Sequence, residues 1–70
     1  MAASIRIHVN GAARDFTAAP TFEELLSELA LAGRRIAVER NGEIVPRSRF
    51  AEARVADGDH IEVVVAVGGG

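Results

Sequence analysis

The chain has 70 residues, of which 49% are hydrophobic and 26% are charged, which is enough for one small domain. Eight basic residues against ten acidic ones give a net charge of −2, so the chain lacks the excess of positive charge that is typical of nucleic-acid-binding proteins. Cysteine is absent, and every basic residue is an arginine rather than a lysine. These absences exclude a disulfide scaffold, a cysteine-based zinc site, an iron–sulfur cluster, a thiol nucleophile and a Schiff-base lysine.

Signals for membranes and secretion are missing from the sequence as well. Charged residues interrupt every stretch that approaches the roughly 20 apolar residues of a membrane span. The first residues lack the charged start and the long apolar run of a signal peptide. We therefore expect a soluble cytoplasmic protein with no membrane partner and no nucleic-acid partner.

The chain begins with the pattern of a β-hairpin. Isoleucine and valine alternate with polar residues over residues 5–9, which is typical of a half-buried strand. Asn10-Gly11 follows and favours a tight type I′ turn, because both central residues of that turn need a positive φ. A weaker strand over residues 12–17, with Phe16 as its apolar anchor, completes the hairpin.

A helix comes next. Thr21 and Glu24 have the spacing of a capping box, in which each residue satisfies a backbone N–H of the other. Apolar residues then recur at helical spacing while glutamates take the opposite face. Gly33 is the predicted stop signal, so the sequence predicts a helix over residues 22–32.

The second half of the chain contains three more predicted strands. Residues 36–39 alternate in polarity, Asn41-Gly42 favours a second hairpin, and residues 43–45 form a short return strand that Pro46 ends. The β-branched run 60–67 is the best candidate for a central strand.

The segment between the last two strands is mixed in character. We expect a short helical turn within residues 47–55 that buries Phe50 and Val55. Asp57-Gly58-Asp59 then predicts a tight turn before the last strand.

The order β-β-α-β-β-β predicts an α+β domain of the β-grasp type. One helix covers one face of a mixed four- to five-stranded sheet, with the first and last strands side by side in the middle. We expect this domain to occupy residues 1–67 and residues 68–70 to form a flexible glycine tail.

No arrangement of residues predicts a catalytic or metal site. His8 and His60 fall on separate predicted strands without metal-ligand spacing, and the serines have no neighbouring histidine. Asp57 and Asp59 flank a turn but lack the twelve-residue pattern of a calcium loop. We therefore expect a protein that is not an enzyme and holds no metal.

The terminal Gly68-Gly69-Gly70 predicts a different kind of chemistry. Ordering three consecutive glycines costs backbone entropy, so these residues are not expected to stabilise the fold. They are either a frayed end or the remnant of a linker, or a segment that an enzyme binds as its substrate. A terminal carboxylate becomes reactive only when it is activated, for example by adenylation. Residues without a Cβ can pass through a narrow channel into an enzyme that performs this step. Gly70 would then carry the reacting carboxylate.

Several segments together resemble the ThiS family of sulfur carrier proteins, within the ThiS/MoaD group that has the ubiquitin-like β-grasp fold. The resemblance covers the whole chain, and this tail has one glycine more than the minimal family pattern. The segments that carry it are Thr21–Leu29, Asn41-Gly42-Glu43-Ile44-Val45-Pro46-Arg47, Asp57-Gly58-Asp59-His60-Ile61-Glu62 and Val67-Gly68-Gly69-Gly70.

The resemblance implies a function in thiamin biosynthesis. A ThiF/MoeB-type enzyme would use ATP to adenylate the Gly70 carboxylate, with Gly68 and Gly69 entering its active site. Sulfur relayed from a cysteine desulfurase would convert Gly70 to a thiocarboxylate, which would donate sulfur to thiazole synthase. The chain itself would bind no cofactor and would act as a protein co-substrate. Three alternatives remain: a MoaD-like carrier for molybdopterin synthesis, a ubiquitin-like protein modifier, and a non-catalytic binding module.

A partner-docking surface is expected on the sheet face that the helix leaves uncovered. Val64 and Ala66 would form an apolar spot there, ringed by charge near the root of the tail. Scattered surface apolar atoms are the alternative reading. Charge is also segregated, because residues 34–54 carry a net +3 and residues 55–70 a net −3, which could orient a partner. If the first and last strands are neighbours, all the predicted docking residues should lie near the root of the tail; they are Arg6, His8, Glu62, Val64 and Ala66.

Overall fold

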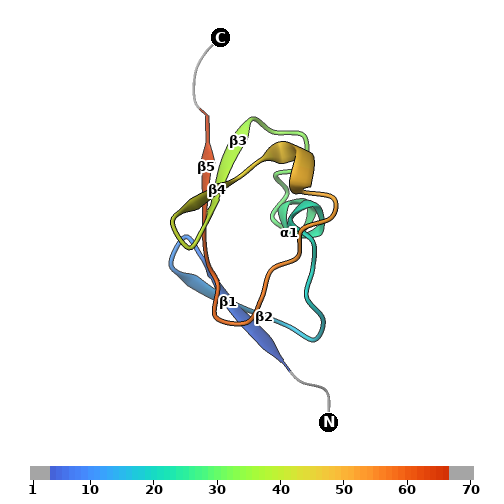
Figure 1. The fold of residues 1–70 in the computed structure, drawn as a ribbon, viewed down its shortest axis with the longest axis vertical. Helices are drawn as coiled ribbons and strands as arrows, with labels where there is room; N and C mark the ends of the chain where they lie inside the picture. The colour runs from blue at the N-terminus through green and yellow to red at the C-terminus, as the bar shows by residue number, and fades with distance from the viewer. Residues whose placement is uncertain (1–3, 67–70) are drawn as a thin grey trace.

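The computed structural model describes residues 4–66 of the chain, so Val67 and the predicted glycine tail lie outside the described residues. The elements follow the predicted order, and none of the described helices is long and apolar enough to cross a membrane. The strands are β1 (Ile5–Val9), β2 (Ala12–Phe16), β3 (Ile36–Arg40), β4 (Glu43–Val45) and β5 (His60–Val65), and the helices are α1 (Phe22–Glu28) and the short 3₁₀ helix η1 (Arg47–Arg49) (Figure 1).

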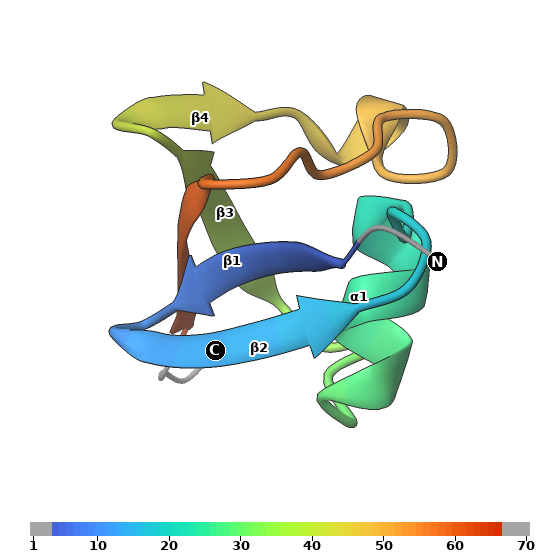
Figure 2. The ribbon, with the colours of Figure 1, turned by 90° about the horizontal axis from the view of Figure 1, so that it is seen from below.

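The described strands form one mixed sheet in the order β2-β1-β5-β3-β4. The last strand, β5, lies in the middle beside β1, as the sequence predicts. It runs parallel to β1 and antiparallel to β3. Figure 2 shows α1 and the segment around η1 on the same side of this sheet. The architecture is therefore α+β with a central pairing of the first and last strands, which is the β-grasp arrangement.

The core lies between the sheet and α1. It forms because the alternating apolar residues of β1, β3 and β5 meet the apolar stripe of the helix. Phe50 and Val55 close it from the segment after β4, as predicted, and the Phe50 ring lies 6.3 Å from that of Phe22. The buried apolar residues are Ile7, Val9, Phe22, Leu25, Leu26, Val38, Phe50, Val55, Ile61 and Val63.

The start of α1 is the predicted capping box. The Thr21 hydroxyl accepts the Glu24 backbone N–H at 3.1 Å, and the Thr21 N–H donates to the Glu24 carboxylate at 2.8 Å. This N–H holds the pKa of Glu24 below its ordinary value, and the nearby Arg54 guanidinium lowers it further. Glu24 is therefore charged where the positive end of the helix dipole favours a negative charge.

The predicted end of the helix is wrong, because α1 ends at Glu28 rather than near Gly33. Ala30 adopts a left-handed φ of 61°, and its N–H donates to Ser27 O at 3.0 Å. The Leu31 N–H donates to Leu26 O at 2.8 Å, which completes a Schellman motif. Leu31 packs against the core from this position, and that packing turns the chain early although an alanine must take the glycine-favoured conformation.

Candidate functional site at the end of the central strand

The sheet has a second face that α1 does not cover, which we call the open face. Alternation along β5 buries Ile61 and Val63 on the helix side and turns Glu62 and Val64 to the open face. Val64 on β5 and Ile44 on β4 are large apolar side chains that remain 58% and 64% exposed. By register, the open face consists of Arg6, His8, Ala13, Asp15, Ala37, Glu39, Ile44, His60, Glu62 and Val64.

Three of the predicted docking residues lie toward the end of β5, next to the root of the tail. Glu62, Val64 and Ala66 are exposed and alternate on the same side of the chain. The Ala66 N–H donates to Arg35 O at 2.9 Å, which ties the last described residue to the start of β3. The root of the tail is therefore held to the sheet up to Ala66.

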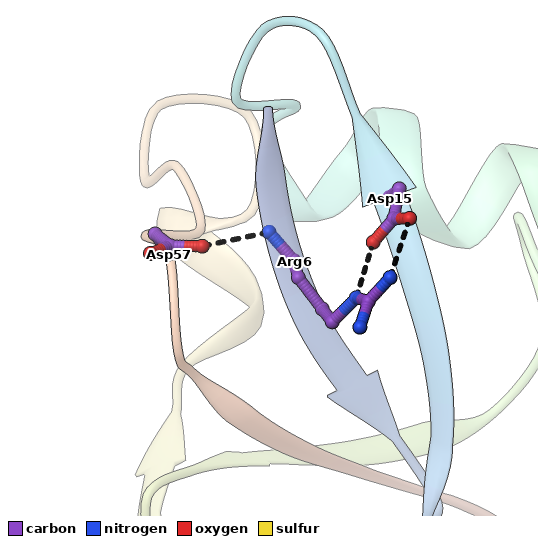
Figure 3. Close-up of polar contacts among 3 residues, drawn as sticks. All are labelled: Arg6, Asp15 and Asp57. Atoms are coloured by element: carbon purple, nitrogen blue, oxygen red, sulfur yellow. Dashed lines mark hydrogen bonds and ion pairs between the residues drawn. The ribbon is translucent and has the colours of Figure 1, made fainter. Parts of the chain in front are cut away.

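Arg6 does not lie near the root of the tail, so this part of the prediction is wrong. Since β1 runs parallel to β5, Arg6 is level with the turn before β5. Its carbonyl accepts the Gly58 N–H, and its own N–H donates to Asp57 Oδ1, each at 2.8 Å. Its guanidinium binds Asp15 at 2.7 and 3.0 Å and lowers the pKa of that carboxyl (Figure 3). From this end of β5 to Ala66 is roughly 20 Å at the usual rise per residue.

His8 also lies at the start of β5, where it stacks on His60. The two residues are partners in the parallel register, and their rings are 5.0 Å apart with an interplanar angle of 11°. The sequence pairs the first and last strands but does not give their register, so this contact was not predicted. Within residues 4–66, no three His, Asp or Glu side chains gather as a metal site.

The asparagines of the two Asn-Gly turns position β5 through side-chain hydrogen bonds, a role that the turn motif alone does not predict. Asn10 Oδ1 accepts the Val63 N–H at 2.8 Å, and its Nδ2 donates to Val63 O at 3.1 Å. Asn41 Oδ1 accepts the His60 N–H at 2.9 Å on the opposite side of β5. Asn10 thus bonds β5 just beyond the point where β1 ends, so β5 continues past its parallel neighbour toward the tail.

The Asp57–Asp59 turn is structural. Asp59 is buried and accepts the Ala56 N–H at 2.8 Å, while the Arg40 guanidinium lies 2.9 Å from its carboxylate. The Asp59 carboxylate also accepts a hydrogen bond from Asn41 Nδ2 at 3.0 Å. These bonds fix the start of β5 and use the carboxylate oxygens that a cation would need.

The site is therefore an exposed sheet face and a strand that leads into a tail, with the glycines themselves outside the described residues. Such an arrangement can dock on a partner and present a chain terminus. By fold, the chain is a ubiquitin-like β-grasp domain. Its neighbours include the crystal structure of a thiamine biosynthesis protein (ThiS) from Geobacter metallireducens, with a TM-score of 0.78 and 35% identity, covering 94% of this chain and 100% of that one.

Sequence comparisons identify the family. Residues 7–70 match the model of the ThiS family. The sulfur carrier protein ThiS of Bacillus subtilis is 42% identical over 50 residues, which are 71% of this chain and 76% of that protein. A thiazole synthase of Paramagnetospirillum magneticum is 48% identical over 66 residues, or 94% of this chain, but the chain spans only 20% of its length. The chain belongs to the ThiS family, as its sequence motifs predict.

Proposed function

We propose that this chain is the sulfur carrier of thiamin biosynthesis and that the Gly70 carboxylate bears the sulfur. The observation that carries the proposal is the family match, which runs through residue 70 and so includes the terminal glycines. The described part of the chain adds an exposed sheet face on which Val64, next to the tail, is 58% exposed. The chain then acts as a protein co-substrate in the cytoplasm, and ATP is used by its partner.

The proposed chemistry begins at Gly70. A carboxylate oxygen attacks the α-phosphorus of ATP on a ThiF/MoeB-type enzyme, and pyrophosphate leaves to give an acyl adenylate. The terminal sulfur of a persulfide, derived from a cysteine desulfurase, attacks the acyl carbon, and AMP leaves. A thiol then cleaves the acyl disulfide and leaves the Gly70 thiocarboxylate. Gly68 and Gly69 suit this chemistry because they add no side chain to the segment that enters the partner.

The thiocarboxylate is proposed to donate its sulfur to thiazole synthase. Support comes from the thiazole synthases of Paramagnetospirillum magneticum and Magnetococcus marinus, in each of which a region matches 94% of this chain. Relatives with names from thiamin biosynthesis favour this pathway over molybdopterin synthesis and over protein modification.

The open face is the proposed docking surface for these partners. Val64 and Ala66 form its apolar part next to the tail, and Glu62 supplies a neighbouring charge. Arg6 and His8 share the face at its far end, where they would contact only a partner that covers the length of β5.

Intact-mass measurement tests the proposal. We expect the chain to gain about 16 Da, one oxygen replaced by sulfur, when incubated with the adenylating enzyme, ATP and a sulfur source. A chain without Gly69 and Gly70 should keep the same circular dichroism spectrum and unfolding midpoint but gain no mass. Mass gain by the truncated chain, or none by the full chain, would contradict the proposal.

A further inference from the structure

Three arginines stand around the root of the tail, and we call Arg34, Arg35 and Arg47 the arginine rim. The Arg35 carbonyl accepts a hydrogen bond from the Ala66 N–H at 2.9 Å, and Arg47 Nη2 donates one to the Arg34 carbonyl at 3.4 Å. Arg35 and Arg47 line a hollow of about 260 Å³. Its other lining residues are Ile36, Ala37, Val64 and Ala66, so the floor between the two cations is apolar.

A second hollow adjoins the first and shares Ile36 and Arg47 with it. Its volume is about 340 Å³, and Leu26, Leu31 and Phe50 contribute apolar lining. Arg34 and Glu23 also line it, so its border carries charges of both signs. The arginine rim therefore stands beside two apolar hollows near the open face and the helix end.

No ion pair within residues 4–66 neutralises the charges of the arginine rim. Arg6, Arg40, Arg49 and Arg54 each form an ion pair with a carboxylate. Within the described part of the chain, the three arginines of the rim have no such pair. Guanidinium groups bind carboxylates in a planar, bidentate geometry. Unpaired arginines around an apolar floor thus complement a surface on which carboxylates flank an apolar side chain.

We infer that the arginine rim binds carboxylates around the entrance of the adenylating enzyme's active site. This inference rests on the proposed function. Four residues follow Ala66, and four residues of any chain reach at most about 14 Å. When Gly70 occupies the active site, Ala66 must therefore lie at its entrance, and the rim lies there with it. The rim steers and orients the carrier so that the tail enters.

Lysine substitution allows a direct test, because the chain contains no lysine. Arg35→Lys and Arg47→Lys each keep the positive charge and add a single side-chain amine that a carbodiimide joins to a touching carboxylate. Arg14→Lys is the matched control, since Arg14 lies on the edge strand β2 and also has no ion pair within residues 4–66. The N-terminal amine is common to all three proteins and gives the background.

We expect Arg35→Lys and Arg47→Lys to cross-link to the adenylating enzyme at least about five-fold more than Arg14→Lys. Peptide mapping should place the bonds on aspartates or glutamates of that enzyme, and about 0.5 M salt should suppress them. Equal cross-linking by Arg14→Lys, absence of rim cross-links, or rim cross-links to thiazole synthase alone would overturn the inference.

Association kinetics provide a second readout that does not depend on cross-linking. Arg35→Gln with Arg47→Gln should slow association about ten-fold at low salt, and Arg14→Gln less than about two-fold, with the difference lost at high salt. Equal unfolding midpoints establish that the variants are folded. Mass gain by the unaltered chain is measured first. Its absence counts against the proposed function, whereas mass gain with unchanged kinetics in the rim variant overturns only the role of the rim.

Discussion

Val63 and Val64 are adjacent valines on β5, yet Val63 is 7% exposed and Val64 is 58% exposed. Val63 packs into the core and pairs with Val38, while its backbone is held by Asn10. Val64 pairs with Ala37 on the open face. The strand β5 thus contributes core residues on one face and part of the proposed docking surface on the other. Substitutions on the two faces should therefore have separable effects on stability and on binding.

The largest expected effect on stability is the loss of a core side chain from β5. Val63→Ala removes two buried methyl groups and leaves a cavity, so we expect the free energy of unfolding to fall by about 2.5 kcal/mol. Val64→Ala is the matched control and should cost less than about 0.5 kcal/mol. Urea unfolding measures both, and similar losses in the two variants would break the distinction between the faces.

Asn10 tests how β5 is held beyond the end of β1. Asn10→Ala loses two hydrogen bonds to Val63 and places an alanine at a φ of 50°, so we expect a loss of about 2 kcal/mol. Asn10→Gly loses the same bonds but accepts the turn conformation, and it should lose about 1 kcal/mol. If both variants unfold like the unaltered chain in urea, the side-chain bonds contribute nothing.

On the open face, the effect should be on binding instead. Val64→Asp places a charge in the apolar part of the docking surface, so we expect binding to the adenylating enzyme to weaken about ten-fold, or about 1.4 kcal/mol. Titration calorimetry measures the affinity, and the unfolding midpoint should stay within a few degrees. Unchanged affinity would place the docking surface elsewhere.

Ala30 offers a stabilising change on the helix side. Glycine accepts the φ of 61° without the steric penalty of a Cβ, so Ala30→Gly should raise the free energy of unfolding by about 1 kcal/mol. Ala32→Gly is the control in the same loop, and it should lower stability by about 0.5 kcal/mol because its φ is not positive. A loss of stability in Ala30→Gly would contradict the account of the helix end.

The smallest effect is the pH dependence of the helix cap. The pKa of Glu24 is lowered in the folded chain, so the unfolded chain binds this proton more readily. The stabilisation by Glu24 is present above its ordinary value of 4.5 and is lost as the pH falls through the lower folded value. Glu24→Gln keeps an amide oxygen for Thr21, so the stability difference between the two proteins should shrink from pH 7 to 3. A constant difference in urea unfolding would contradict this.

Most of the fold was predictable because its signals are local. The Asn-Gly turns, the capping box and the alternation along β5 each arise within a few residues and appear where the sequence places them. The end of α1 was not predictable from Gly33, because the packing of Leu31 on the core turns the chain at Ala30 instead. Tertiary packing overrode the local signal there.

The candidate site was less accessible to sequence reasoning because it depends on long-range register. The neighbourhood of β1 and β5 was predicted, but the pairing of His8 with His60 fixes Arg6 at the end of β5 remote from the tail. The hydrogen bonds between Asn10 and Val63 join residues 53 positions apart in the chain, and no local sequence pattern predicts them. The role of the terminal glycines stays a prediction.

The most direct test of the separation between the two faces is a residue-by-residue map of the partner's footprint. Amide signals of the isotopically labelled chain would be recorded by NMR as the adenylating enzyme is added. The account predicts the strongest broadening at Glu62, Val64 and Ala66, and little at Leu25 on α1. Strongest broadening on α1, with β5 unaffected, would contradict the account.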